Sequence, residues 1–158
     1  LALSASRSFL FNQVIAARIS EQLFDQLLSG DVVQLNGSGS IFTLDTVTPE
    51  LQQRLAGRDI HLTAPLVGLG KEMVQAEAAA FEQRVLQPWQ SWQQALQLLR
   101  VQAGRRSMRL LPEQLTVATD GDTVQLSFAL PAGCFATSVL RELVNYRDAA
   151  RDIAQMEC

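Results

Sequence analysis

The sequence predicts a mixed fold of the α/β or α+β class. Stretches with apolar residues at helical spacing alternate with short apolar stretches typical of strands, Gly and Pro residues separate the two kinds, and no internal repeat is found. The chain has 158 residues, of which 47% are hydrophobic and 18% charged, and its mean hydropathy is near zero. This composition is typical of a folded protein with a substantial core.

The first 44 residues predict a long helix and a hairpin. No Gly or Pro interrupts the helical spacing of apolar residues between Ser4 and Ser29, and Ser4 is a candidate N-cap. Residues 32–44 then predict two short strands around the turn sequence NGSGS at 36–40.

The middle of the chain predicts three helices and one strand. Residues 48–57 place Thr at an N-cap, Pro at the first helical position and Gly at the end of a short helix. The apolar stretch 61–67 resembles a strand. A helix follows over 71–86, and Pro88 ends or kinks it. Residues 89–104 predict another helix with an aromatic inner stripe, closed by its final Gly.

The last third predicts a β-hairpin and a helix. Residues 115–119 and 124–130 alternate apolar with smaller or polar side chains on either side of Asp120-Gly121. The sequence Pro-Ala-Gly at 131–133 ends the second strand, and residues 135–144 return to helical spacing.

Several kinds of site are not expected. The single histidine, His61, lies in an apolar stretch, and with Cys134 and Cys158 it offers no zinc-type spacing, disulfide framework or catalytic triad. The sequences GSGS and GLGKE lack phosphate-loop spacing and are interpreted as turns. Because no apolar run approaches the ~18 residues of a membrane span and no secretory signal is present, we expect a soluble, intracellular protein without a metal or a membrane anchor.

One cluster of positive charge stands out in a chain of net charge −3. No acidic residue lies between Arg100 and Glu113, and the cluster also contains Arg105, Arg106 and Arg109. These guanidinium groups could bind RNA phosphates. Equally, they could be the solvated end of a helix, where cations favourably meet the helix dipole.

A strand, a Pro-Gly corner and a helix start follow one another closely between Leu130 and Ser138. An aromatic side chain there, Phe135, could stack on an unpaired base. Taken alone, a phenylalanine at such a place is more often part of the core.

These residues carry a resemblance to a known family. The stretch 126–143, LSFALPAGCFATSVLREL, closely resembles the C-terminal motif of the TruD family of tRNA pseudouridine synthases. The resemblance extends to SASRSFLFNQVIAARI at 4–19, GDVVQLNGSGSIF at 30–42, the stretch 64–66 and AGRRSMRLLPEQL at 103–115. It covers nearly the whole chain in the expected order.

The resemblance implies an isomerase that converts a uridine of tRNA, position 13 in the family's characteristic substrate, to pseudouridine. Members use an essential aspartate and neither cofactor nor metal. The aromatic side chain of the last motif lies against the target base and matches Phe135, which reverses the core interpretation. The family usually has Ser where this chain has Cys134, a change between small residues that we expect to preserve the corner.

The family's aspartate motif, of the type Gly-x-Lys-Asp, is absent, as is the Asn- and Phe-bearing motif of its cleft. None of Asp31, Asp45 and Asp120 has the matching context, so no catalytic residue is assigned. Together with the start at Leu1, this predicts roughly the C-terminal half of such an enzyme, inactive in isolation. Residues 1–109 resemble most of the family's inserted TRUD domain.

Residues 110–158 resemble the final hairpin and helix of the catalytic domain, whose outer edges we expect to be unpartnered in isolation. The first hypothesis is therefore that the chain is part of a cytoplasmic tRNA modification enzyme, which we expect to be monomeric when intact. The alternatives are a non-catalytic tRNA-binding module and a pseudoenzyme.

Overall fold

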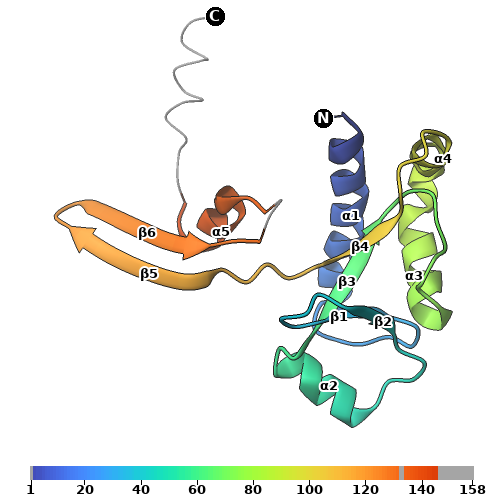
Figure 1. The fold of residues 1–158 in the computed structure, drawn as a ribbon, viewed down its shortest axis with the longest axis horizontal. Coiled ribbons are helices and arrows are strands. Elements are labelled where there is room, and N and C mark those ends of the chain that lie inside the picture. Colours follow the sequence, from blue (N-terminus) through green and yellow to red (C-terminus); the bar gives the residue numbers. More distant parts are fainter. Residues whose placement is uncertain (1, 132–133, 146–158) are drawn as a thin grey trace, which may run out of the picture. The chain divides into compact units, whose positions relative to one another are not determined.

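The computed structural model describes residues 2–131 and 134–145 and divides the chain into two compact units (Figure 1). Unit 1 is Leu1–Arg109 and unit 2 is Leu110–Cys158. Helices and antiparallel strands occur in both, which confirms the predicted mixed class. Among the described residues, no helix is long and apolar enough to cross a membrane.

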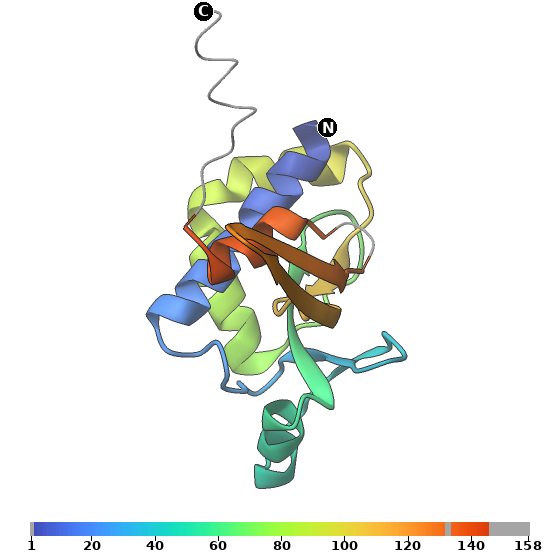
Figure 2. The ribbon, with the colours of Figure 1, turned by 90° about the vertical axis from the view of Figure 1, so that its left-hand side faces the viewer.

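Unit 1 combines a four-stranded antiparallel sheet, in the order β2-β1-β3-β4, with four helices. Helix α1 packs on β3 and on α3, while α2 lies at the far end of the unit from α4 (Figures 1 and 2). Its elements are α1 (Ala2–Ser20), β1 (Val32–Leu35), β2 (Ile41–Thr43), α2 (Pro49–Ala56), β3 (Ile60–Leu66), α3 (Ala76–Leu86), the 3-10 turn η1 (Gln87–Trp89), α4 (Gln90–Leu98) and β4 (Gly104–Ser107).

Several elements begin and end where local signals predict. Strands β1 and β2 pair around the Gly-Ser turn, and the predicted strand at 61–67 corresponds to β3. The hydroxyl of Thr48 accepts a hydrogen bond from the Leu51 N–H at 3.3 Å, and Gly57 caps the other end of α2. These features depend on neighbours in sequence, which explains why the sequence predicts them.

The helix predicted over residues 4–29 is wrong at both ends. Helix α1 includes Ser4, which therefore is not its N-cap, and stops at Ser20. Arg18 reaches back to the segment that follows, where its Nη1 donates to the carbonyl oxygens of Leu23 at 3.5 Å and Gln26 at 3.2 Å. These bonds stabilise a turn in place of further helix.

The helix predicted over 71–86 begins only at Ala76, because contacts distant in sequence hold residues 71–75 outside the helix. The Gln75 N–H donates to the Gly30 carbonyl at 3.0 Å, and a Cβ at Gly30 would lie 1.9 Å from the Gln75 oxygen. The Thr43 hydroxyl donates to the Met73 carbonyl at 2.8 Å. Only glycine allows this approach at position 30, where φ is 81°.

The core of unit 1 is formed where α1, α3 and the sheet meet. Burying each large apolar side chain contributes about 1.5–3 kcal/mol to folding. The core side chains from these elements include Leu10, Phe11, Val14, Val33, Ile60, Leu62, Ala64, Phe81 and Leu86.

Unit 2 consists of β5 (Glu113–Asp120), β6 (Thr123–Ala129) and α5 (Ala136–Leu143). The predicted hairpin and helix are confirmed, and Gly121 occupies the turn with a φ of 54°. The predicted corner at 131–133 lies mostly outside the described residues. Every residue of β5 is exposed, and β5 and β6 form a sheet of two strands within the described part of unit 2.

A buried ion pair joins the end of α1 to the approach to β1. The Nη2 of Arg18 donates to Asp31 Oδ1, both side chains are fully buried, and the other Asp31 oxygen accepts from the Leu28 N–H at 2.7 Å. Burial raises the pKa of the Asp31 carboxyl, against the opposing effect of the Arg18 guanidinium. The pair therefore holds the turn that replaces the last part of the predicted helix.

Asp31→Asn should destabilise unit 1 by about 3–5 kcal/mol, because it leaves the Arg18 charge buried without a counter-charge. Urea unfolding followed by tryptophan fluorescence measures this effect, since both tryptophans lie in unit 1. The matched control is Asp59→Asn, which removes an exposed partner of Arg54 and should cost less than about 1 kcal/mol. Equal losses in the two variants would contradict the role of the buried pair.

Candidate functional site

Phe135 lies at the N-terminal end of α5, in unit 2. Its backbone is extended, its carbonyl oxygen accepts from the Ser138 N–H at 3.0 Å, and no side chain caps the helix. The side chain is 71% exposed. The structure therefore does not place Phe135 in the core of its unit, and its ring is free to contact another molecule or another part of the protein.

Unit 2 also exposes apolar side chains along its hairpin. Leu115, Val117 and Val124 are each at least 44% exposed, as is Leu143 on α5. A hairpin of two strands with this much exposed apolar surface is marginally stable by itself. Phe135 thus belongs to a surface that lacks a partner among the described residues of its unit.

The four arginines of the predicted cluster do not form one surface. Neighbouring residues of a strand point to opposite faces, so Arg105 and Arg106 on β4 separate. Arg105 is 6% exposed and forms a bidentate ion pair with Glu82 of α3, at 2.9 and 2.7 Å, while its Nε and Nη2 donate to Thr63. Its burial corrects the interpretation of Arg105 as an exposed phosphate ligand.

The other three arginines are at least partly accessible. The Arg106 guanidinium stacks on Phe11, with its carbon 3.9 Å from the ring centre. Arg109 pairs with Asp25, and Arg100 lies exposed in the loop between α4 and β4, with no ion pair among the described residues. Arg100 and Arg106 are therefore the members whose charges remain available.

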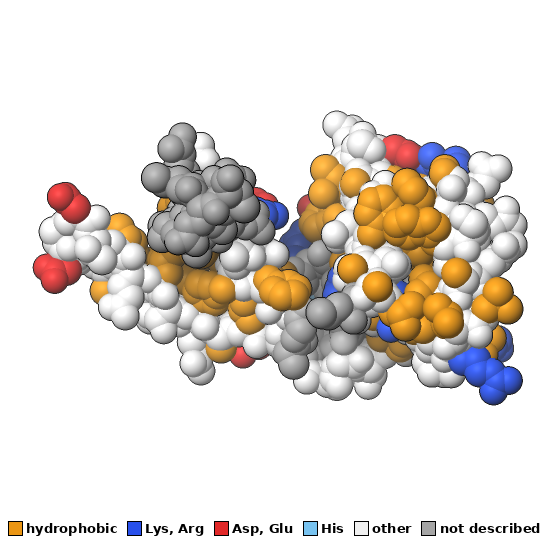
Figure 3. Space-filling view, turned by 90° about the horizontal axis from the view of Figure 1, so that it is seen from above, with side chains coloured by type: hydrophobic (Ala, Val, Ile, Leu, Met, Phe, Trp, Pro, Cys, Tyr) orange, Lys and Arg blue, Asp and Glu red, His pale blue; other side chains and the backbone are white. Residues whose placement is uncertain are grey.

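The end of unit 1 where α1 begins is apolar rather than cationic. Figure 3 shows hydrophobic side chains gathered on this face, with positive side chains only at scattered points. The predicted aromatic stripe contributes, since Trp89 packs edge-on against Phe9 at 4.7 Å and against Trp92 at 5.5 Å between ring centres. Trp92, Leu98 and Leu99 remain exposed.

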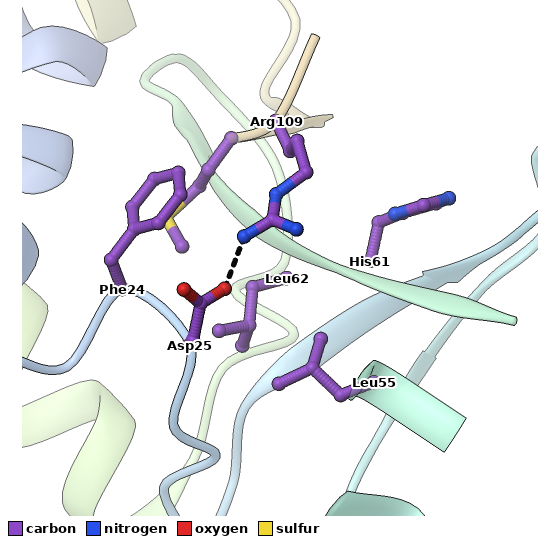
Figure 4. A pocket seen from close by; sticks show the side chains of 7 residues that line it. Phe24, Asp25, Leu55, His61, Leu62 and Arg109 are labelled. Atoms are coloured by element: carbon purple, nitrogen blue, oxygen red, sulfur yellow. Dashed lines mark hydrogen bonds and ion pairs between the residues drawn. The ribbon is translucent and has the colours of Figure 1, made fainter. Parts of the chain in front are cut away.

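A small pocket lies beside the Arg109–Asp25 pair (Figure 4). His61 of β3 lines it, and the His61 Nε2 lies 3.2 Å from Asn36 Oδ1. The cavity measures about 10 Å³, which is room for one water molecule at most. Desolvation lowers the pKa of His61, and the positive charges of Arg109 and Arg58 lower it further. This pocket cannot hold a substrate.

No group of three or more metal-ligating side chains occurs in the part of the chain that the structure describes. The sequence did not indicate that Glu82 would be buried in α3. The only available signal was a carboxylate on the same helix as the apolar residues Phe81 and Leu86, which many exposed helices also show.

The His61 pKa should lie below its ordinary value of about 6.5 in the folded chain. Because the folded state then binds fewer protons than the unfolded state, stability from this group is complete above about pH 6.5 and is lost as the pH falls toward the folded-state pKa. An NMR titration follows the one histidine directly. Arg109→Gln should raise the midpoint, and a wild-type midpoint at or above 6.5 would contradict the assignment.

The chain is similar to proteins of one family. The family model described as tRNA pseudouridine synthase D (TruD) matches residues 1–143. The tRNA pseudouridine synthase D of Aeromonas salmonicida is 50% identical over 149 residues, which cover 94% of this chain and 42% of the relative. The tRNA pseudouridine synthase D of Idiomarina loihiensis is 47% identical over 152 residues, which cover 96% of this chain and 43% of that relative. The chain thus spans about two fifths of the length of these relatives.

A solved structure has a similar fold. The Methanosarcina mazei protein described as tRNA pseudouridine synthase D aligns with a TM-score of 0.60 over 86% of this chain and 36% of that protein, at 24% identity. At this identity the likeness shows the fold alone. The match of the family model to residues 1–143 and the high identity of the relatives show that the chain belongs to the TruD family of tRNA pseudouridine synthases.

Proposed function

We propose that this chain is part of an enzyme that isomerises uridine, at the family's position 13, to pseudouridine in tRNA. The observation that carries the proposal is the family match over residues 1–143, which includes the motif around Phe135. We expect an enzyme that acts on tRNA to lie in the cytoplasm, and we expect the intact enzyme to be monomeric.

We assign the two units to different parts of this enzyme. Unit 1 corresponds to most of the inserted TRUD domain, and unit 2 to the end of the catalytic domain. The exposed strand β5 supports this assignment for unit 2, because a hairpin with two exposed faces is expected to pack against further strands or helices.

Phe135 would act on the target uridine as a stacking surface. Chemistry on a base requires the base to leave the RNA stack, at a cost of a few kcal/mol that contacts in the pocket must offset. An exposed aromatic ring at the start of a helix suits this task, since every base has a π-face. The family's aspartate motif does not occur in these 158 residues, so we expect them to form no pseudouridine by themselves.

Arg100 and Arg106 are the arginines that we propose for phosphate contacts. Arg105 is buried in an ion pair with Glu82, and the charge of Arg109 is partly neutralised by Asp25. The absence of a Gly-x-Lys-Asp motif keeps both alternatives, a tRNA-binding module that does no chemistry and a pseudoenzyme.

Phe135→Ala in the longer enzyme should lower kcat/KM for tRNA by about 5- to 150-fold, because stacking a base on an aromatic side chain contributes about 1–3 kcal/mol. Phe135→Tyr should retain most of the activity. Ile19→Ala, at an exposed position of α1, is the control for loss of an exposed apolar side chain. If Phe135→Ala turns over tRNA like the wild type, the assigned role is wrong. A longer enzyme that binds tRNA but forms no pseudouridine would favour the binding module.

Arg100→Gln combined with Arg106→Gln should weaken binding of tRNA and lower the slope of log K against log salt by about one to two. Titrations at several salt concentrations measure this slope. The control, Arg54→Gln with Arg84→Gln, removes the same charge from arginines already paired with Asp59 and Glu21 and should change the slope less. Equal slopes in the wild type and the first variant would contradict the phosphate contacts.

A further inference from the structure

Unit 1 contains a second cavity, much larger than the one beside His61. It measures about 280 Å³ and lies between helices α3 and α4, the ends of β3 and β4 that adjoin each other, and the segment 67–74. This volume is close to the lower limit of about 300 Å³ for small-molecule sites, so the cavity suits a ligand smaller than a typical drug.

Hydrogen bonds from the Arg7 side chain and to the Val101 backbone hold the wall of the cavity in place. The Arg7 guanidinium donates to the carbonyl oxygens of Val67 at 3.1 Å, Leu66 at 3.2 Å and Gln102 at 2.7 Å. The Leu69 N–H donates to the Val101 carbonyl at 2.6 Å. The cavity is therefore a preformed feature of the unit and not a gap beside a loose loop, which lowers the cost of ordering on binding.

A glycine allows the same wall to approach its neighbour. A Cβ at Gly68 would lie 2.2 Å from the Val101 carbonyl oxygen. Any residue other than glycine would therefore clash with this oxygen unless the backbone moved. The sequence GLGKE thus serves the wall of a cavity in addition to making a turn.

The lining combines apolar surface with amide groups. Leu66, Leu86 and Ala79 supply apolar surface, while four glutamines line the cavity: Gln83, Gln93, Gln97 and Gln102. Gln93 Nε2 donates to the Leu86 carbonyl at 2.8 Å, which leaves its oxygen available. The other three side-chain amides make no hydrogen bond to any residue that the structure describes. Each amide can both donate and accept.

The cavity carries little net charge. Arg105 and Glu82 line it but neutralise each other, and Lys71 at the lining is followed by Glu72. A site with balanced charges favours an uncharged ligand over a phosphate or a carboxylate. The ligand should therefore have apolar faces and an edge of hydrogen-bond donors and acceptors that can pair with side-chain amides.

We propose that this cavity binds a single nucleobase. A base has two apolar faces, and glutamine amides pair with the donor and acceptor edges of bases. A free nucleoside and an unstacked nucleotide of RNA share this chemistry. The inference that the base comes from RNA rests on the proposed function. The inference that the cavity binds a base does not.

Ligand-observed NMR with the 158-residue chain and each of the four ribonucleosides tests the proposal. At least one nucleoside should bind at millimolar concentration. Ala79→Phe fills the cavity from α3 and should weaken binding at least tenfold. Ala80→Phe, one residue along and not in the lining, is the matched control and should leave binding unchanged. Thermal unfolding of both variants confirms that each is folded.

A second pair of variants tests the amides. Gln97→Leu should weaken binding, while Gln94→Leu on the same helix, outside the lining, should not. If no nucleoside binds the wild-type chain, or if Ala79→Phe and Gln97→Leu bind like their controls, the proposal is overturned. Binding of a capped dipeptide in place of every nucleoside would also overturn it, because it would identify a peptide site.

Competition identifies the source of the base. If a single-stranded RNA oligonucleotide displaces the nucleoside from the wild type, RNA supplies the base. If it does not, the cavity binds a free nucleoside and only the RNA source is rejected. This outcome is independent of turnover by the longer enzyme, so failure of the nucleobase site and failure of the synthase proposal are distinguishable.

Discussion

The tertiary structure of unit 1 depends on a buried network of four charges. Arg18 pairs with Asp31, and Arg105 pairs with Glu82. Burial raises the pKa of both carboxyls, and the two pairs also interact, because the Arg105 charge opposes this rise at Asp31 and the Arg18 charge opposes it at Glu82. Together they connect α1, the approach to β1, α3 and β4. Buried ion pairs add little net stability compared with apolar residues, but breaking one is costly, so they restrict the arrangements that these elements can adopt.

This network also determines what the surface of unit 1 offers to RNA. It draws Arg105 inward, so that the dense cationic run in the sequence becomes a few separated charges in the structure. A unit with scattered arginines cannot attract RNA as a continuous basic surface does. Under the proposed function, we therefore expect unit 1 to recognise RNA more by stacking and hydrogen bonding, for which it offers an exposed Trp92 and the glutamine-lined cavity.

Local signals were sufficient for part of the fold. The Thr48-Pro49 start of α2 and the Asp120-Gly121 turn are encoded within a few residues, and both occur as predicted. The early end of α1 and the late start of α3 arise from contacts distant in sequence, such as Gly30 against Gln75. For the candidate site, the residue pattern alone favoured a buried Phe135, and only the resemblance indicated otherwise. Nothing local distinguishes Arg105 from Arg106 before the partner of each is known.

The exposure of Phe135 and that of the hairpin have a common physical basis. Unit 2 contributes one buried residue from α5, Val139, and leaves both faces of β5 exposed within the described residues. So few buried side chains among the described residues offset little of the entropy lost on ordering the unit, and a partner surface would add to this burial. Under the proposed function, the rest of the catalytic domain supplies that surface to the strands. A ring that stacks on a base must instead stay open, so packing should cover Leu115 and Val117 while leaving Phe135 accessible.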